Sequence, residues 1–73
     1  MEEHDIKELL LKESDAFRKA FEDHQACEKE LEQFKAKGFL TETERLAEKE
    51  IKKAKLALKD RMYVMIAERR KSL

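Results

Sequence analysis

The only glycine of this chain, Gly38, separates two long stretches in which apolar residues return every three or four positions. The 73 residues include no proline, so neither stretch contains a residue that forces a helix to break. Apolar residues with this spacing line one side of a helix. The pattern therefore predicts an all-α protein whose core is an antiparallel two-helix hairpin resembling a coiled coil.

The first predicted helix covers about residues 5–37. Asp5 and Glu8 have the spacing of a capping box, and Ser14 begins a second start signal whose side chain can accept a backbone hydrogen bond. The helix is therefore either continuous or broken near residues 12–14, which would leave a short extra N-terminal helix; the break is favoured. Its inward side is predicted to consist of Phe17, Ala20, Phe21, His24, Cys27, Leu31 and Phe34.

A turn at residues 38–40 and a helix over about 41–71 follow. Gly38 is expected to adopt the left-handed conformation after the helix end, which would bring Phe39 onto Phe34. Thr41 and Glu44 form a second capping-box pattern. In an antiparallel hairpin with this turn, Phe17 faces Met62. The inward side of the second helix is predicted to consist of Ala47, Ile51, Ala54, Leu58, Met62 and Met65.

The whole chain, residues 1–73, is predicted to form a single helical-hairpin domain. A domain of this size buries only about 60% of its unfolded surface, so it is marginally stable alone. One partner helix covers a stripe little more than about 100° wide, and this leaves large apolar side chains of the second helix outside it. We therefore expect association with a second copy or another protein into a small helical bundle. The expected interaction face consists of Leu46, Leu56, Tyr63 and Val64.

Charge provides an alternative hypothesis. The formal net charge is zero, but residues 1–37 carry eleven acids and seven bases, whereas residues 38–73 carry six acids and ten bases. A basic stripe of Lys52, Lys53, Lys55 and Lys59 could contact phosphates, which makes a small nucleic-acid-associated protein the alternative function. The same lysines could also form a solvated face that pairs with the acidic first helix.

Catalytic chemistry finds little support in the sequence. His24 and Cys27 lie three residues apart on one helical face, but zinc requires further ligands that are not nearby. The sequence has no glycine-rich loop and too short a turn to frame a pocket. We therefore predict a non-enzymatic protein without catalytic residues, metal, cofactor or small-molecule substrate.

The predicted location is the cytoplasm. The lone Cys27 suits a reducing compartment, and the acidic N-terminus does not resemble a signal peptide. The longest apolar run, Met62–Ala67, has six residues, far below the ~18 of a membrane-spanning helix.

Several of these residues resemble a known family. Phe17, His24 and Leu31, and above all the segment from Lys55 to Asp60 with the later pair Met65-Ile66, are similar to the YdcH-like family of small bacterial proteins of unknown function. The resemblance extends from about His4 to Ile66, with Cys27 in place of an expected leucine. It implies a small cytoplasmic helical hairpin without an established activity, and it supplies no functional residues. Asp60 lies opposite the predicted inward side, so we hypothesise that it serves an oligomer or partner contact.

Overall fold

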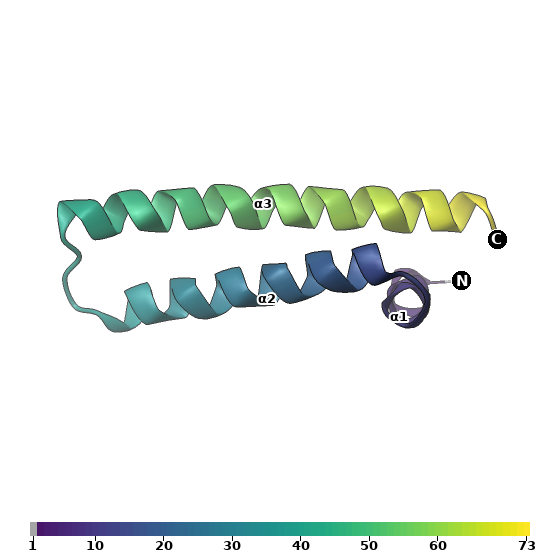
Figure 1. Ribbon diagram of the computed structural model, residues 1–73, viewed down its shortest axis with the longest axis horizontal. Helices are drawn as coiled ribbons and strands as arrows, with labels where there is room; N and C mark the ends of the chain where they lie inside the picture. The colour runs from purple at the N-terminus through teal and green to yellow at the C-terminus, as the bar shows by residue number, and fades with distance from the viewer. Residues whose placement is uncertain (1) are drawn as a thin grey trace.

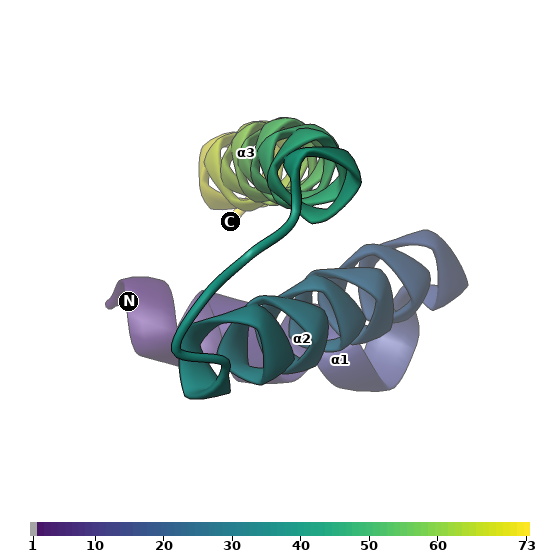
Figure 2. The same ribbon diagram turned by 90° about the vertical axis from the view of Figure 1, so that its left-hand side faces the viewer.

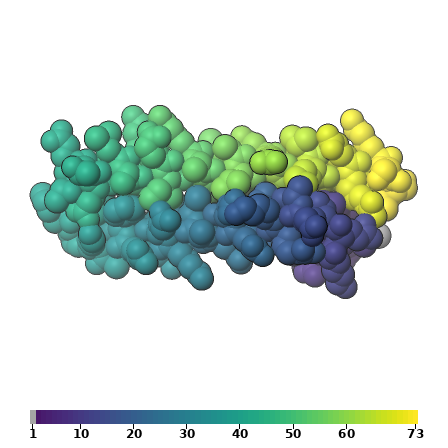
Figure 3. All heavy atoms as spheres, in the orientation of Figure 1, coloured from purple at the N-terminus to yellow at the C-terminus, as the bar shows by residue number. Residues whose placement is uncertain are grey.

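The computed structural model describes residues 2–73 and shows three helices: α1 (Glu3–Glu13), α2 (Asp15–Ala36) and α3 (Glu42–Lys71). The all-α prediction is thereby confirmed. Helices α2 and α3 lie side by side and run in opposite directions (Figure 1). The molecule as a whole is a rod with extents of 48 × 20 × 16 Å. Side chains fill the space between the two ribbons (Figure 3). Met1, which belongs to the predicted domain, lies outside the described residues.

The chain turns sharply between α1 and α2 at Ser14, so the helix is broken there. Ser14 has an extended backbone, and its Oγ accepts a hydrogen bond from the Phe17 amide at 3.1 Å. The Ser14 amide itself donates to the Leu10 carbonyl at 2.8 Å. The Arg18 side chain donates to the carbonyl of Leu11, which would otherwise lack a partner at the end of α1. These bonds make α1 cross the end of the rod instead of extending α2 (Figures 1 and 2).

The predicted cap at the start of α1 is wrong. The helix begins at Glu3, two residues before Asp5, and Asp5 therefore lies within its first turn. Glu2 occupies the capping position and makes no side-chain capping bond. Carboxylates in a first turn still interact favourably with the helix dipole, so Glu3 and Asp5 suit this end without a capping box.

The end of α2 also differs from the prediction. No glycine among residues 2–73 has a positive φ, so Gly38 is not left-handed. Helix α2 instead ends at Ala36, and Lys37 leaves it in an extended conformation while its amide donates to the Phe34 carbonyl at 3.2 Å. Phe39 is 76% exposed, so the expected cover of Phe34 is absent as well. The extended exit carries the chain across to α3 without a tight turn (Figure 2).

The start of α3 follows the prediction. The Thr41 hydroxyl accepts from the Glu44 amide at 3.2 Å, and the Glu44 carboxylate accepts from the Thr41 amide at 3.0 Å, which completes a capping box. Lys37, on the other side of the loop, also pairs with Glu44. The hydrogen bond from Lys37, followed by that from the Thr41 amide, lowers the pKa of Glu44 from 4.5 to about 2.

The apolar core is concentrated where α1 meets the other two helices. Its buried members are Ile6, Leu10, Phe17 and Ile66, with Leu11, Met62 and Met65 packed around them. Met62 thus packs against the cluster that contains Phe17, the neighbour predicted for it. Towards the loop, burial is much sparser, with Leu31 the buried apolar residue of that half. Helix α1 and the C-terminal end of α3 lie at the end of the rod that holds the core (Figure 1).

Four of the six residues predicted for the inward side of α3 are partly buried, namely Ile51, Leu58, Met62 and Met65, but the two alanines near the loop are not. Ala47 and Ala54 are exposed, whereas Glu48 and Lys55 are partly buried. Lys55 and Glu48 lie seven and fourteen residues before Met62, so they share its side of the helix. Met62 and Ile66 belong to the core or pack against it, so positions that share their side of α3 lie toward the neighbouring helices. Near the loop, the partly buried positions of α3 therefore include Glu48 and Lys55 and not the two predicted alanines.

Candidate interaction surfaces

The expected interaction face of α3 is exposed to solvent. Leu46, Leu56, Tyr63 and Val64 are between 50% and 62% exposed. Neighbouring Ala57, Asp60 and Ala67 are exposed too. We call this set, with Lys53, the outer face of α3; it lies on the side of the helix turned away from the core. The exposure of these apolar side chains arises because α1 and α2 both pack on the opposite side.

The four large apolar side chains do not form one compact patch. At about 100° per residue, Leu56 and Tyr63 lie on one flank of the outer face, whereas Leu46 and Val64 lie together on the other. Leu46 and Val64 are also about 27 Å apart along the helix. Lys53 and Asp60 lie between the flanks, and Ala57 lies beside Leu46 and Val64. The outer face is therefore a long surface of mixed apolar and charged residues, suited to another helix lying along it.

Three lysines of the basic stripe have acidic neighbours. Lys52 Nζ is 3.7 Å from Glu48 Oε1, Lys53 Nζ is 3.7 Å from Glu50 Oε1, and Lys55 Nζ is 3.9 Å from Glu28 Oε2. Lys59 has no such pair among residues 2–73. Lys52, Lys55 and Lys59 share one flank of α3, whereas Lys53 points toward the outer face. The structure therefore neither gathers the four lysines on one side nor leaves most of their charge uncompensated.

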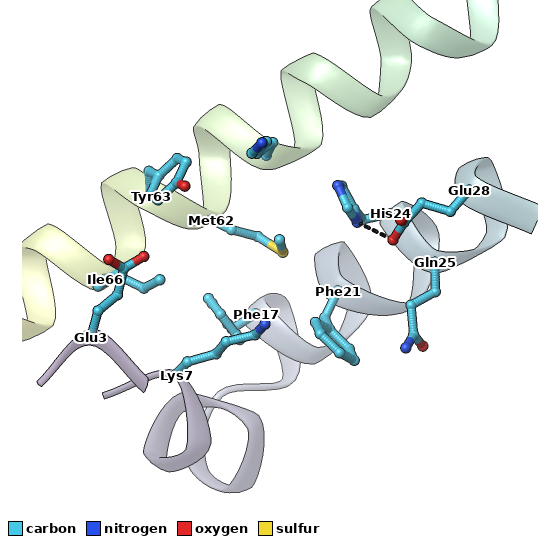
Figure 4. Close-up of a pocket in the computed structure, with 11 residues that line it drawn as sticks. Glu3, Lys7, Phe17, Phe21, His24, Gln25, Glu28, Met62, Tyr63 and Ile66 are labelled. Atoms are coloured by element: carbon cyan, nitrogen blue, oxygen red, sulfur yellow. Dashed lines mark ion pairs between the residues drawn. The ribbon is translucent and has the colours of Figure 1, made fainter. Parts of the chain in front are cut away.

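A groove of about 350 Å³ lies at the junction of the three helices, where α1 crosses the rod (Figure 4). Its apolar wall includes Phe17, Phe21, Met62 and Ile66, and Tyr63 lies at its edge. Sequence reasoning did not foresee this groove, because it depends on the angle at which α1 leaves Ser14. The start signal at Ser14 indicated the break but not its direction.

The polar groups of the groove are of both signs. Lys7 Nζ lies 5.0 Å from the centre of the Phe21 ring, a cation–π contact. His24 Nδ1 lies 3.2 Å from Glu28 Oε1 (Figure 4), while His24 Nε2 is buried without a hydrogen-bond partner. Lys59 and Glu3 complete the rim. The groove thus has no strong preference for one charge.

Among residues 2–73, the fold presents neither a metal-binding cluster nor a membrane-spanning helix. Cys27 is a free, partly buried thiol on α2. Within residues 2–73, no three His, Cys, Asp or Glu side chains are grouped closely enough to hold a metal ion. None of the helices described is both long and apolar enough to span a membrane.

Comparison with known proteins identifies a family without an assigned function. Residues 17–66 match the family model described as "Protein of unknown function (DUF465)". No curated protein and no solved structure matches the chain. The matched region begins in the first turn of α2 and ends at Ile66 of α3. It includes most of the outer face and the basic stripe, whereas α1 lies before it.

Proposed function

The chain belongs to the YdcH-like family of proteins of unknown function, and from that premise we propose that it is a non-enzymatic protein–protein interaction module. The outer face of α3 is the proposed contact surface. The observation that carries the proposal is that four large apolar side chains of one helix are at least half exposed. Single exposed apolar residues are ordinary, but a series along one helix is typical of an interface.

The small core supports this proposal. Six apolar side chains are classed as buried among residues 2–73, and four of them lie in one cluster at the end of the rod. Elsewhere along the helical pair most of the inward apolar side chains are only partly buried, so a partner lying along α3 would add apolar burial. In this proposal α2 and α3 act as a coiled-coil-like pair within a larger helical bundle. The lone Cys27 supports a cytoplasmic location.

Nucleic-acid binding through Lys52, Lys53, Lys55 and Lys59 is the alternative. The acidic neighbours of three of these lysines reduce their attraction for phosphates. Lys59 has no such neighbour among residues 2–73, so its charge is the most available for contact with a phosphate. Binding of this kind would weaken steeply with added salt and would disappear when nucleic acid is digested.

The test is affinity capture of the tagged full chain from a lysate of its source cells, at moderate salt, with and without nuclease. A discrete protein should be recovered in both samples and lost with the double change Leu56→Asp/Tyr63→Asp. The matched control is Lys52→Asp/Lys59→Asp, which also places two aspartates on α3 but leaves the apolar residues intact. Circular dichroism should show that both variants remain helical.

Recovery that resists the Leu56→Asp/Tyr63→Asp change but is lost with Lys52→Asp/Lys59→Asp or with nuclease would overturn the proposal. That result would assign function to the basic stripe. Retention of the same protein by all variants would also exclude the outer face of α3.

A further inference from the structure

Two opposite charges lie on the outer face of α3, exposed and seven residues apart. Lys53 and Asp60 both point away from the core, within about 20° of each other around the helix. Seven residues correspond to about 10 Å along the axis, so the two groups are too far apart to pair within one chain. Lys53 has a glutamate neighbour at 3.7 Å, whereas Asp60 has no ion-pair partner in the part of the chain described.

The midpoint between these charges falls between Leu56 and Ala57. If a second α3 lies antiparallel on the first, with a two-fold axis at this midpoint, residues equally far from the midpoint face each other. Lys53 then faces Asp60 of the second copy, and the symmetry repeats the pair. Leu56 approaches its own equivalent beside the axis. Leu46 faces Ala67 of the second copy at either end of the contact.

From this arrangement we propose that the partner bound by the outer face of α3 is a second copy of the same chain, packed antiparallel about a two-fold axis between Leu56 and Ala57. The inference rests on the proposed function and names its partner. Small residues near the axis and at the ends, Ala57 and Ala67, allow the two helices to approach closely. Asp60, which has no ion-pair partner among residues 2–73, gains one in the dimer.

The exposed surface area of the chain is large enough to accommodate a dimer interface. It exposes 5655 Å², whereas a compact monomer of 8.7 kDa is expected to expose about 4,700 Å². The excess of about 900 Å² is close to the ~800 Å² that each partner buries in an interface of standard size. Two such rods packed along α3 would thus approach the exposure of a compact protein.

The experiment is a charge exchange, measured by sedimentation equilibrium of the full-length chain. The unchanged protein should be a dimer. Lys53→Asp and Asp60→Lys each place like charges opposite one another twice, so each should raise the dissociation constant at least about tenfold. The double variant Lys53→Asp/Asp60→Lys restores opposite charges and should return the dissociation constant to near its original value. All these positions are exposed, so the helical signal should not change.

A crosslinking experiment tests the position of the axis independently. In a Cys27→Ser background, Leu56→Cys should form a disulfide-linked dimer on mild oxidation, because the two cysteines meet beside the axis. The matched control Leu46→Cys, in the same background, should not, since its two copies would lie about 30 Å apart along the helices.

A monomeric chain in sedimentation, a double variant as weak as the single ones, or efficient crosslinking through position 46 instead of 56 would overturn this inference. These results would not by themselves overturn the proposed function. If the chain is monomeric and still captures another protein through Leu56 and Tyr63, the interaction module stands and only the identity of its partner is wrong.

Discussion

Replacing Phe17 by alanine should remove a large part of the stability of the fold. Phe17 is fully buried in the cluster shared by all three helices. Truncating a buried phenylalanine to alanine costs about 3–5 kcal/mol. A domain of 73 residues has a total stability of about 4–11 kcal/mol, at the usual 0.05–0.15 kcal/mol per residue. We therefore expect the Phe17→Ala variant to lose between about a quarter and all of its free energy of unfolding.

The matched control is Phe39→Ala, which removes the same atoms from a side chain that is 76% exposed. An exposed substitution of this kind changes stability by no more than about 0.5 kcal/mol. The assay is urea unfolding followed by circular dichroism at one protein concentration, since self-association would make apparent stability depend on concentration. Thermal unfolding of Phe17→Ala should begin about 12 °C or more below that of the unchanged chain.

Equal losses in the two variants would refute the assignment of the core to this end of the rod. Ile6→Ala provides a further check, because Ile6 is fully buried but belongs to α1, outside the residues matched by the family model. A loss of about 2–5 kcal/mol is expected for it. No loss would mean that α1 does not hold the other helices together.

Two further predictions concern the loop between α2 and α3. Gly38→Ala should leave stability unchanged or raise it by up to about 1 kcal/mol in urea unfolding, because Gly38 has no positive φ and an added Cβ would meet nothing within 4 Å; a clear loss would favour the left-handed turn instead. The lowered pKa of Glu44 means that its carboxylate stabilises the fold above pH 4.5, and that this contribution is lost as the pH falls from 4.5 to about 2. An NMR titration of the Glu44 carboxyl should show this pKa, and Lys37→Ala should raise it; titration near 4.5 in the unchanged chain would contradict the contact.

Local signals in the sequence located the helix boundaries well where a side chain caps the backbone. Ser14 and Thr41 carry hydroxyl groups that accept the expected amide hydrogen bonds, so their residue types and spacing were sufficient. The prediction of a left-handed Gly38 was wrong because glycine permits that conformation without requiring it. The path of the loop depends on the distance between α2 and α3, which no local pattern contains.

The partial burial of Glu48 and Lys55 could not be read from the apolar pattern of α3. Near the loop, Ala47 and Ala54 are more apolar than Glu48 and Lys55, yet the charged pair is partly buried and the alanines are exposed. The deciding contacts lie some four turns away, where Ile6 and Leu10 of α1 hold Ile66. The exposure of Leu56 and Tyr63 was nevertheless predicted, because one neighbouring helix covers too narrow a stripe of α3 to reach them.

The core at one end of the rod also determines how the molecule would respond to mechanical load. The start of α1 and the end of α3 lie beside that core, so a force pulling them apart would separate α3 from α1 and α2 in an unzipping geometry. The cluster around Phe17 would bear the load first and give the highest resistance. Beyond it most apolar side chains are only partly buried, so the loop half would separate at a lower force. A single rupture event, near the chain ends, is the expected mechanical signature of this fold.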